Sequence, residues 1–386
     1  MEVKQIYELV NDVTDEVLGK TDLKVNEDLS NLVDVGTAVF NANAFENFTK
    51  TLVDHIGRMV FVARVYKGEL PSMLRDAWEY GSVKEKVRAV LPEAVEDPAW
   101  NLEDGESYDT NKFTAPSVSV KFFDSLTTFM VPISITEKQL KSAFSNVGQM
   151  NAFVSMLYTN VENTIKIKND ELVRRTIDNM IGETFYNLDN NGVYSGKTGT
   201  KCINLLYEYN TAFGTTLTPQ TALINKDFLR FASIKIKKMI KRLKTASTLF
   251  NIGGTEKFTP VEYQHLILLS DFAEDVNGYL YSDTFNKENV ELPSNYETTN
   301  YWQGTGKGYA YDDISKISIK TKSEHNITAT YVIGVLFDHE ACGVSNMEKT
   351  VKSHYVEVSE FVNEWHKTQA AYWNDLDENF IVFYLA

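Results

Sequence analysis

Two short stretches of the sequence have residue types that could cradle a phosphate group. Residues 192–198 (GVYSGKT) approach a phosphate-binding P-loop, but that motif needs four residues between its first glycine and the Gly-Lys-Ser/Thr triplet, and this chain has three. Residues 304–308 (GTGKG) lack the glycine spacing of a dinucleotide-binding loop, and no helix is expected after them to offer its N-terminus to a phosphate. Both stretches are interpreted as glycine-rich turns.

Side chains suited to acid–base, metal or nucleophilic chemistry are scattered along the chain. The six histidines form no pair at helical spacing, and none belongs to an HExxH motif. Asp312 and Asp313 precede an expected strand and fit a turn better than a catalytic carboxylate pair. We therefore predict no catalytic, cofactor-binding or metal-binding residue, no cofactor and no enzyme activity. An enzyme with an unrecognised site, for instance at 192–198, stays open as an alternative.

The composition describes a folded, acidic protein. The chain has 38 Lys and Arg against 53 Asp and Glu, and the net charge of −15 is the wrong sign for a protein that wraps nucleic acid. The hydrophobic content of 43% supports real cores, and 386 residues suffice for two or three domains of roughly 100–200 residues each. The basic run at 235–244 leaves three interpretations open: a nucleic-acid patch, a solvated helix face or an intersubunit salt-bridge surface.

Cysteine usage and hydropathy indicate a cytoplasmic origin. Cys202 and Cys342 lie far apart in no metal-binding pattern, so we expect two free buried thiols, although one disulfide stays open. The first 18 residues alternate charged and apolar side chains and resemble neither a secretory signal nor a membrane anchor. No window approaches the ~20 apolar residues of a membrane span. We expect no membrane contact.

A single long helix is the main structural prediction. Between Gly148 and Gly182 the sequence has no glycine or proline, and apolar residues recur there with gaps of three, four and seven. About 33 residues at ~1.5 Å each give a rod of about 50 Å, against an average helix of roughly 11–12 residues. Polar residues at 166–170 thin out the apolar stripe and allow a bend. Just upstream, Thr136 and Gln139 have the spacing of a capping box.

An acidic excursion precedes this helix. Residues 67–116 hold four of the eight prolines and an acidic middle at 93–104. Its flanks, 82–91 and 117–123, alternate well enough to pair as a hairpin, and extended loops of this length are usually functional. Its aromatic residues are too many for a solvated flap, so we take them as candidate intersubunit contacts, with packing on their own subunit as the alternative. They are Trp78, Tyr80, Trp100, Tyr108 and Phe113.

The rest of the chain mixes helices and strands without a regular strand–helix–strand repeat, which favours the α+β class. We expect an amphipathic helix at 1–20, a polar irregular stretch at 22–36, a helix at 45–56 and a helix at 228–244. The last helix is predicted to bury Phe228, Phe231, Ile234, Met239, Ile240 and Leu243. Strands are expected at 58–66, 127–135, 264–269, 313–320, 328–337, 351–358 and 379–385.

Several patches, in this order, carry a resemblance to a known family. They are 48–57 (FTKTLVDHIG), 67–70, 134–157 (SITEKQLKSAFSNVGQMNAFVSML), 265–292 and 372–385. The chain resembles the major capsid proteins of tailed bacteriophages with the Hong Kong 97-type fold, especially those of small podoviruses of the Bacillus-phage group. The stretch at 134–157 is the most specific match, because it resembles the entry into the spine helix of that fold.

The resemblance implies an architecture of five parts. They are an N-terminal arm and lead-in at 1–57, peripheral-domain strands at 58–135 with an extended E-loop at about 67–116, a spine helix at 136–184, an axial domain at 185–325, and a return to the peripheral domain at 326–386.

It also implies a function. Copies of the chain would form pentamers and hexamers of an icosahedral or prolate shell, assembled in the host cytoplasm around double-stranded DNA and retained in the virion. Implied partners are the chain itself, a scaffolding protein, a portal, decoration proteins and packaged DNA in weak non-specific contact. An encapsulin-like nanocompartment shell stays open as an alternative.

Overall fold

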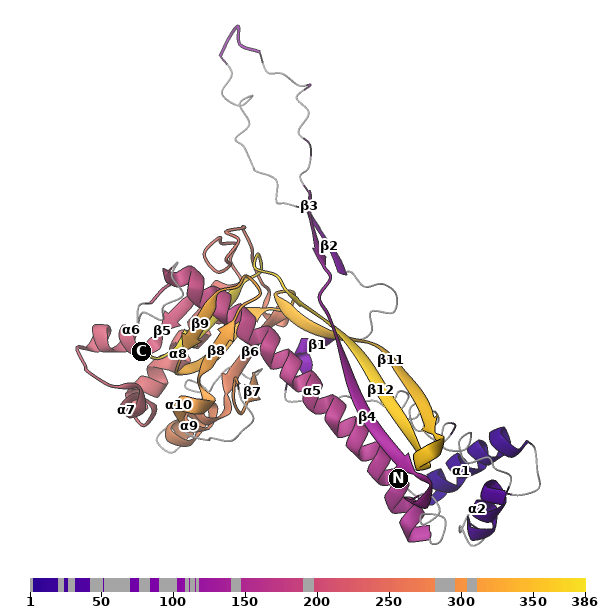
Figure 1. Ribbon diagram of the computed structural model, residues 1–386. Helices are drawn as coiled ribbons and strands as arrows, with labels where there is room; N and C mark the ends of the chain where they lie inside the picture. The colour runs from indigo at the N-terminus through magenta and orange to yellow at the C-terminus, as the bar shows by residue number, and fades with distance from the viewer. Residues whose placement is uncertain are drawn as a thin grey trace.

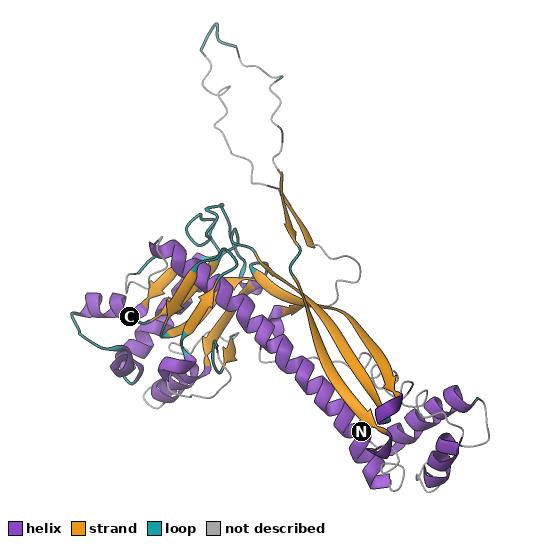
Figure 2. Cartoon of the chain, viewed as in Figure 1, coloured by secondary structure: helices purple, strands orange, loops and turns teal. Residues whose placement is uncertain are grey.

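The computed structural model describes most of the chain and places one long helix across two sheets (Figure 1). The described residues are 3–19, 24–26, 32–41, 51, 70–75, 84–89, 103–107, 111, 115, 118–139, 147–189, 198–281, 296–303 and 311–386. Helices and strands are interspersed along the chain, as the α+β prediction requires (Figure 2).

The long helix, α5 (Val147–Asp189), has 43 residues and is longer than predicted at its C-terminal end. It remains helical through residues 166–170, and both flanking glycines lie inside it. Gly182 has a packing role there, because a Cβ at this position would lie 2.7 Å from Cγ2 of Thr321 in the turn that follows β8. The helix therefore continues through Gly182, which permits close packing there, and ends five residues beyond the expected limit of 184.

The capping box predicted upstream of α5 is present. The backbone N–H of Thr136 donates to Oε1 of Gln139 at 3.0 Å, and the backbone N–H of Gln139 donates to Oγ1 of Thr136 at 3.3 Å. It begins a helical turn at 137–139, and α5 begins at Val147; residues 140–146 lie outside the described residues. Within the described residues, α5 covers the expected spine helix of 136–184 from Val147 onward.

The first half of α5 runs beside a long four-stranded sheet (Figure 1). The strand order is β1 (Leu74–Arg75), β11 (Cys342–Val356), β12 (Phe361–Asn374) and β4 (Leu126–Thr136). The pairs β11–β12 and β12–β4 are antiparallel, and β1 pairs with β11 in parallel. Exposed and half-buried residues alternate along β4, so this strand keeps one face open. β12 was not predicted, and β11 begins nine residues before the strand expected at 351.

The second half of α5 packs beside a five-stranded sheet that is buried almost throughout. The strand order is β5 (Cys202–Asn204), β13 (Phe380–Tyr384), β10 (Val332–Asp338), β6 (Gln264–Leu269) and β7 (Glu297–Thr299). Three helices, α6 (Leu205–Phe213), α8 (Lys226–Arg242) and α9 (Ser270–Tyr281), lie around it (Figure 2). No helix in the described residues is both long and apolar enough to cross a bilayer.

Several sequence-based boundaries change. The strand expected at 313–320 is a short helix, α10 (Tyr311–Ile314), followed by β8 (Ile317–Lys320). The strand expected at 328–337 is divided between β9 (Asn326–Ala329) and β10, because Tyr331 adopts a left-handed conformation with φ of 55°. The stretch 326–386 does not return to one sheet: β11 and β12 belong to the four-stranded sheet, whereas β10 and β13 belong to the five-stranded one.

The N-terminal helix is present as α1 (Val3–Leu18), which packs against α5. A second helix, α2 (Leu32–Asn41), begins within the stretch expected to be irregular. On α8, Ile234 is exposed and Ile236 is buried, so the predicted inward face is wrong at this position. Most of the helix expected at 45–56 and all of the strand expected at 58–66 lie outside the described residues.

Candidate assembly site at the base of the extended hairpin

Two strands of the acidic excursion form the hairpin that the alternating pattern predicts. β2 (Lys84–Ala89) pairs antiparallel with β3 (Val118–Phe123), and Lys86 lies directly opposite Lys121. Because side chains alternate along a strand, the hairpin has two distinct faces. Cations occupy the inner face, at Lys84, Lys86, Arg88 and Lys121. The outer face is mostly apolar, with Val87, Val118, Val120 and Phe122, and its one described charge is Glu85, opposite Phe122.

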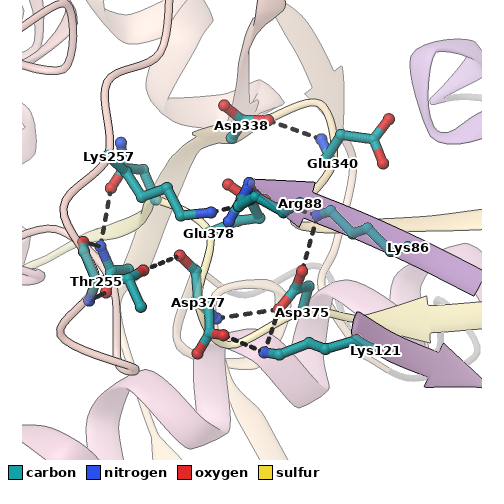
Figure 3. Close-up of polar contacts among 12 residues, drawn as sticks. Lys86, Arg88, Lys121, Thr255, Lys257, Asp338, Glu340, Asp375, Asp377 and Glu378 are labelled. Atoms are coloured by element: carbon teal, nitrogen blue, oxygen red, sulfur yellow. Dashed lines mark hydrogen bonds and ion pairs between the residues drawn. The ribbon is translucent and has the colours of Figure 1, made fainter. Parts of the chain in front are cut away.

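The cations contact an acidic turn between β12 and β13 (Figure 3). Lys86 Nζ lies 2.7 Å from Oδ2 of Asp375 and 2.6 Å from Oε1 of Glu378. Lys121 Nζ lies 2.8 Å from Oδ1 of Asp375 and also pairs with Asp377. The carboxylates of Asp375 and Glu378 are only 2% and 3% exposed, so these ion pairs are shielded from solvent on the acidic side.

Asp375 offsets the repulsion between two lysines of the hairpin. Two lysines directly opposite each other on neighbouring strands repel. Asp375 binds Lys86 through one carboxylate oxygen and Lys121 through the other. Burial alone would raise the pKa of Asp375, but hydrogen bonds from Lys121 and Lys86 outweigh it and lower the pKa below its ordinary value. The pairing of β2 with β3 therefore depends on a carboxylate from a distant part of the chain.

Glu378 forms ion pairs with three cations. Besides Lys86, it pairs with Arg88 and, at 3.4 Å, with Lys257. A buried charge is tolerated only when its desolvation is compensated by close partners. The same carboxylate thus links the hairpin to the loop after α8 and to the five-stranded sheet (Figure 3).

A second turn, between β10 and β11, holds the start of β2. Glu340 pairs with Arg75 at 2.5 Å and with Lys84 at 3.4 Å, and both cations lie over the Trp373 ring, at 4.9 and 3.8 Å from its centroid. Burial alone would raise the pKa of Glu340, but Arg75, with Lys84 and Lys86, lowers it to about 2. The hairpin base is therefore fixed to two turns that connect the sheets, the β10–β11 turn and the β12–β13 turn.

The outer face of the hairpin has the opposite character. Val87, Val118, Val120 and Phe122 are between 45 and 65% exposed, and Leu126 and Met130 continue this apolar exposure along β4. Large exposed apolar patches on a protein usually mark an interaction site. The hairpin is thus held by ions on one face and open to an apolar partner on the other.

The structure places the residues singled out from sequence as follows. The five aromatic candidates, Trp78, Tyr80, Trp100, Tyr108 and Phe113, lie outside the described residues, as do 304–308 and most of 192–198. On the basic helix α8, Lys235 pairs with Glu208 at 2.5 Å. Within the described residues, no cluster of three or more His, Cys, Asp or Glu is arranged to hold a metal ion.

Sequence reasoning missed the acidic turn at 375–378. Its residues (DLDE) have the composition of an ordinary solvated turn, and the hairpin cations that they bind lie more than 250 residues upstream. The only available indication was the run of three cations at alternating positions in β2, which requires compensation if that face is buried.

Comparison with known proteins identifies the family. The sequence matches the model of the Phi29-like phage major capsid protein family over residues 10–384. The chain belongs to this family. It is similar to the major capsid protein of Bacillus phage GA-1, with 19% identity over 292 residues, which are 75% of this chain and 56% of that protein. The chain thus spans little more than half the length of this relative.

A solved structure from a phage particle has a similar fold. A chain in the structure of the head fiber and inner core protein gp22 of native bacteriophage P68 has a TM-score of 0.54 at 9% identity, covering 83% of this chain and 85% of that one. A chain in the capsid structure of Staphylococcus phage Andhra has a TM-score of 0.49 at 8% identity, covering 84% and 86%. The capsid-protein resemblance seen in the sequence is confirmed, and proteins of this family are structural components of the virion.

Proposed function

We propose that copies of this chain self-assemble into the pentamers and hexamers of an icosahedral or prolate shell around double-stranded DNA. Family membership over residues 10–384 supports a shell subunit. The observation that supports assembly through this surface is the two-faced hairpin, with an ion-paired inner face and an apolar outer face left open in the single chain. The outer face would be buried against a neighbouring copy.

The architecture supports a Hong Kong 97-type division of labour. α5 and the four-stranded sheet would form the peripheral domain, the five-stranded sheet and its helices the axial domain, and β2–β3 the base of the E-loop. α1 and α2 would belong to the N-terminal arm. In this arrangement the ion pairs at Asp375, Glu378 and Glu340 set the direction in which the E-loop leaves its own subunit.

Partners beyond the chain itself follow from the same role. A closed shell that receives DNA needs a portal, and we expect a separate scaffolding protein and decoration proteins. The net charge of −15 favours weak, non-specific contact with packaged DNA, because general repulsion prevents tight wrapping.

A charge-insertion variant tests the apolar outer face. In Val120→Glu/Phe122→Glu both substituted side chains are exposed in the single subunit, so circular dichroism and thermal unfolding should remain near those of wild type. Assembly should fail, because two carboxylates would be buried without partners in the intersubunit contact. The readouts are sedimentation velocity and electron microscopy of the protein expressed with its scaffold.

The matched control is Phe122→Leu, which keeps the face apolar and should still yield closed particles. Normal shells from the double glutamate variant would show that the outer face is not an assembly surface.

A further inference from the structure

A small polar pocket lies where α5 meets the turn after β8 and the end of β12. Its volume is about 110 Å³, several times the space that one water molecule needs. Arg175 and Asn179 line it from α5, Lys320 and Lys322 from the β8 side, and Asn374 from β12. The pocket therefore touches the long helix, the end of β12 in the four-stranded sheet, and the turn between β8 and β9, which pair as a separate two-stranded sheet.

The lining carries three positive charges and no carboxylate. Arg175 is exposed and pairs with no carboxylate among the described residues. Lys320 has only the well-exposed Glu324, at 3.5 Å, and Lys322 donates to the hydroxyl of Ser125. Arg175 and Lys322 thus have no carboxylate partner among the described residues, and with Lys320 they place like charges around one pocket that repel one another unless an anion lies among them.

Carboxylates near the pocket are engaged elsewhere. Glu183, one turn beyond Asn179 on α5, accepts from the backbone N–H of Ser323 at 3.3 Å and pairs with Nδ1 of His325 at 3.2 Å. It does not line the pocket. Apart from Glu324 at Lys320, the described residues therefore offer no carboxylate to the cations of the lining.

The pocket walls are fixed by hydrogen bonds. Oδ1 of Asn179 accepts from the backbone N–H of Lys322 at 2.7 Å, so its Nδ2 amide is the group it can offer to a ligand. Nδ2 of Asn374 donates to the carbonyl of Thr176 at 2.8 Å and ties β12 to α5. These hydrogen bonds hold the backbone and amide groups of the wall in place, which lowers the cost of binding a ligand there.

We propose that this pocket binds a phosphate group, with Arg175 and Lys322 as its principal contacts. The planar guanidinium of arginine suits bidentate contact with a phosphate, and lysine supplies a point charge. The phosphate is either a backbone phosphate of DNA, in which case the inference rests on the proposed function, or free inorganic phosphate. A bound phosphate links α5, the β8–β9 turn and β12, and so stiffens the contact of the two-stranded β8–β9 sheet with α5 and the four-stranded sheet.

Thermal unfolding of the full-length protein tests this without requiring assembly. A ligand that binds only the folded state raises the melting temperature. Wild type and Arg175→Gln are compared in sodium phosphate and in sodium chloride at equal ionic strength. Because phosphate also stabilises proteins generally, the informative quantity is the difference between the two increments. Phosphate should raise the melting temperature of wild type at least twice as much as that of Arg175→Gln.

The matched control is Lys168→Gln, which removes an exposed cation two turns away on the same helix. It should keep the wild-type increment, and Lys322→Gln should lose it. Equal increments in wild type, Arg175→Gln and Lys322→Gln would overturn the proposal, whether or not the protein forms shells.

A second measurement separates the two sources. Fluorescence anisotropy with a 20-base-pair duplex, over a salt series, should show weaker binding by Arg175→Gln and a salt slope reduced by about 1 if the phosphate belongs to DNA. Duplex binding unchanged by the substitution, with the phosphate increment lost, assigns the site to free phosphate. A poly-glutamate peptide whose binding is lost in Arg175→Gln, without any phosphate increment in wild type, would replace the proposal with an acidic protein partner.

Discussion

The two sheets differ in what they leave for other chains. The five-stranded sheet is buried within its own subunit: all five residues of β13 (FIVFY) are buried, and so are four of the six residues of β6. The four-stranded sheet and the β2–β3 hairpin are partly exposed, since β4 keeps an exposed face and the outer face of β2–β3 is apolar and open. We therefore interpret the five-stranded sheet as the stable body of the subunit, and the other region is the one that we propose as a surface for a neighbour.

The largest contrast is expected between two phenylalanines. Phe383→Ala removes a fully buried ring from the five-stranded sheet and should cost about 3–5 kcal/mol of unfolding free energy. Phe122→Ala removes an exposed ring from the hairpin and should change it by no more than about 0.5 kcal/mol. Urea unfolding of the unassembled protein gives both values. A similar cost for the two would mean that the hairpin already packs on its own subunit.

Much of this division could be predicted from local pattern. Period-two alternation predicted that 82–91 and 117–123 pair, and β2 and β3 do so. The glycine- and proline-free stretch predicted a helix that exists with wider limits. These features depend on neighbouring residues, and local spacing is sufficient to specify them.

β12 could not be found in this way. Its buried face carries Glu364, His366 and Thr368, so the polar positions that normally point to solvent point inward. The acidic anchor at Asp375 and Glu378 was missed for a different reason. Its partners in the hairpin are separated from it by 254 to 292 residues, and no local pattern encodes that pairing.

Breaking this anchor is the second-largest effect that we expect. Asp375→Asn leaves Lys86 and Lys121 facing each other without their shared carboxylate, and we expect a loss of about 1–3 kcal/mol, because both lysines retain some solvent contact. The hairpin should also become more sensitive to limited proteolysis.

The control for this variant is Glu171→Gln, which breaks an exposed pair with Lys168 on α5 and should cost less than about 1 kcal/mol. If Asp375→Asn changes the unfolding free energy and the rate of proteolysis no more than Glu171→Gln does, the buried ion pairs do not hold the hairpin.

A smaller effect is expected in acid at the other turn. The pKa of Glu340 is about 2 in the folded protein, below the ordinary glutamate value of about 4.3. Its ionised form therefore stabilises the folded state, and this stabilisation is fully present at pH values above about 4.3. This contribution should be lost as the pH falls from about 4.5 towards 2. Glu340→Gln should therefore show a shallower loss of stability in that window, measured by chemical unfolding at a series of pH values. Identical pH dependence in wild type and variant would show that the ion pairs of Glu340 do not stabilise the folded state.

The two cysteines offer the finest comparison, because each sheet contains one. Cys202 begins β5 of the five-stranded sheet and Cys342 begins β11 of the four-stranded sheet, and both are free and buried. Burial raises the pKa of both thiols, so neither should react without local opening of the structure. If the four-stranded sheet is completed by neighbours, as we propose, Cys342 should be labelled by a thiol reagent faster than Cys202 in the unassembled protein. Each ~1.4 kcal/mol of difference in opening free energy gives roughly a tenfold difference in rate.

The single-thiol variants Cys202→Ala and Cys342→Ala assign the two rates, and assembly should slow labelling at Cys342 more than at Cys202. Faster labelling at Cys202 would reverse the comparison and make the five-stranded sheet the less stable region.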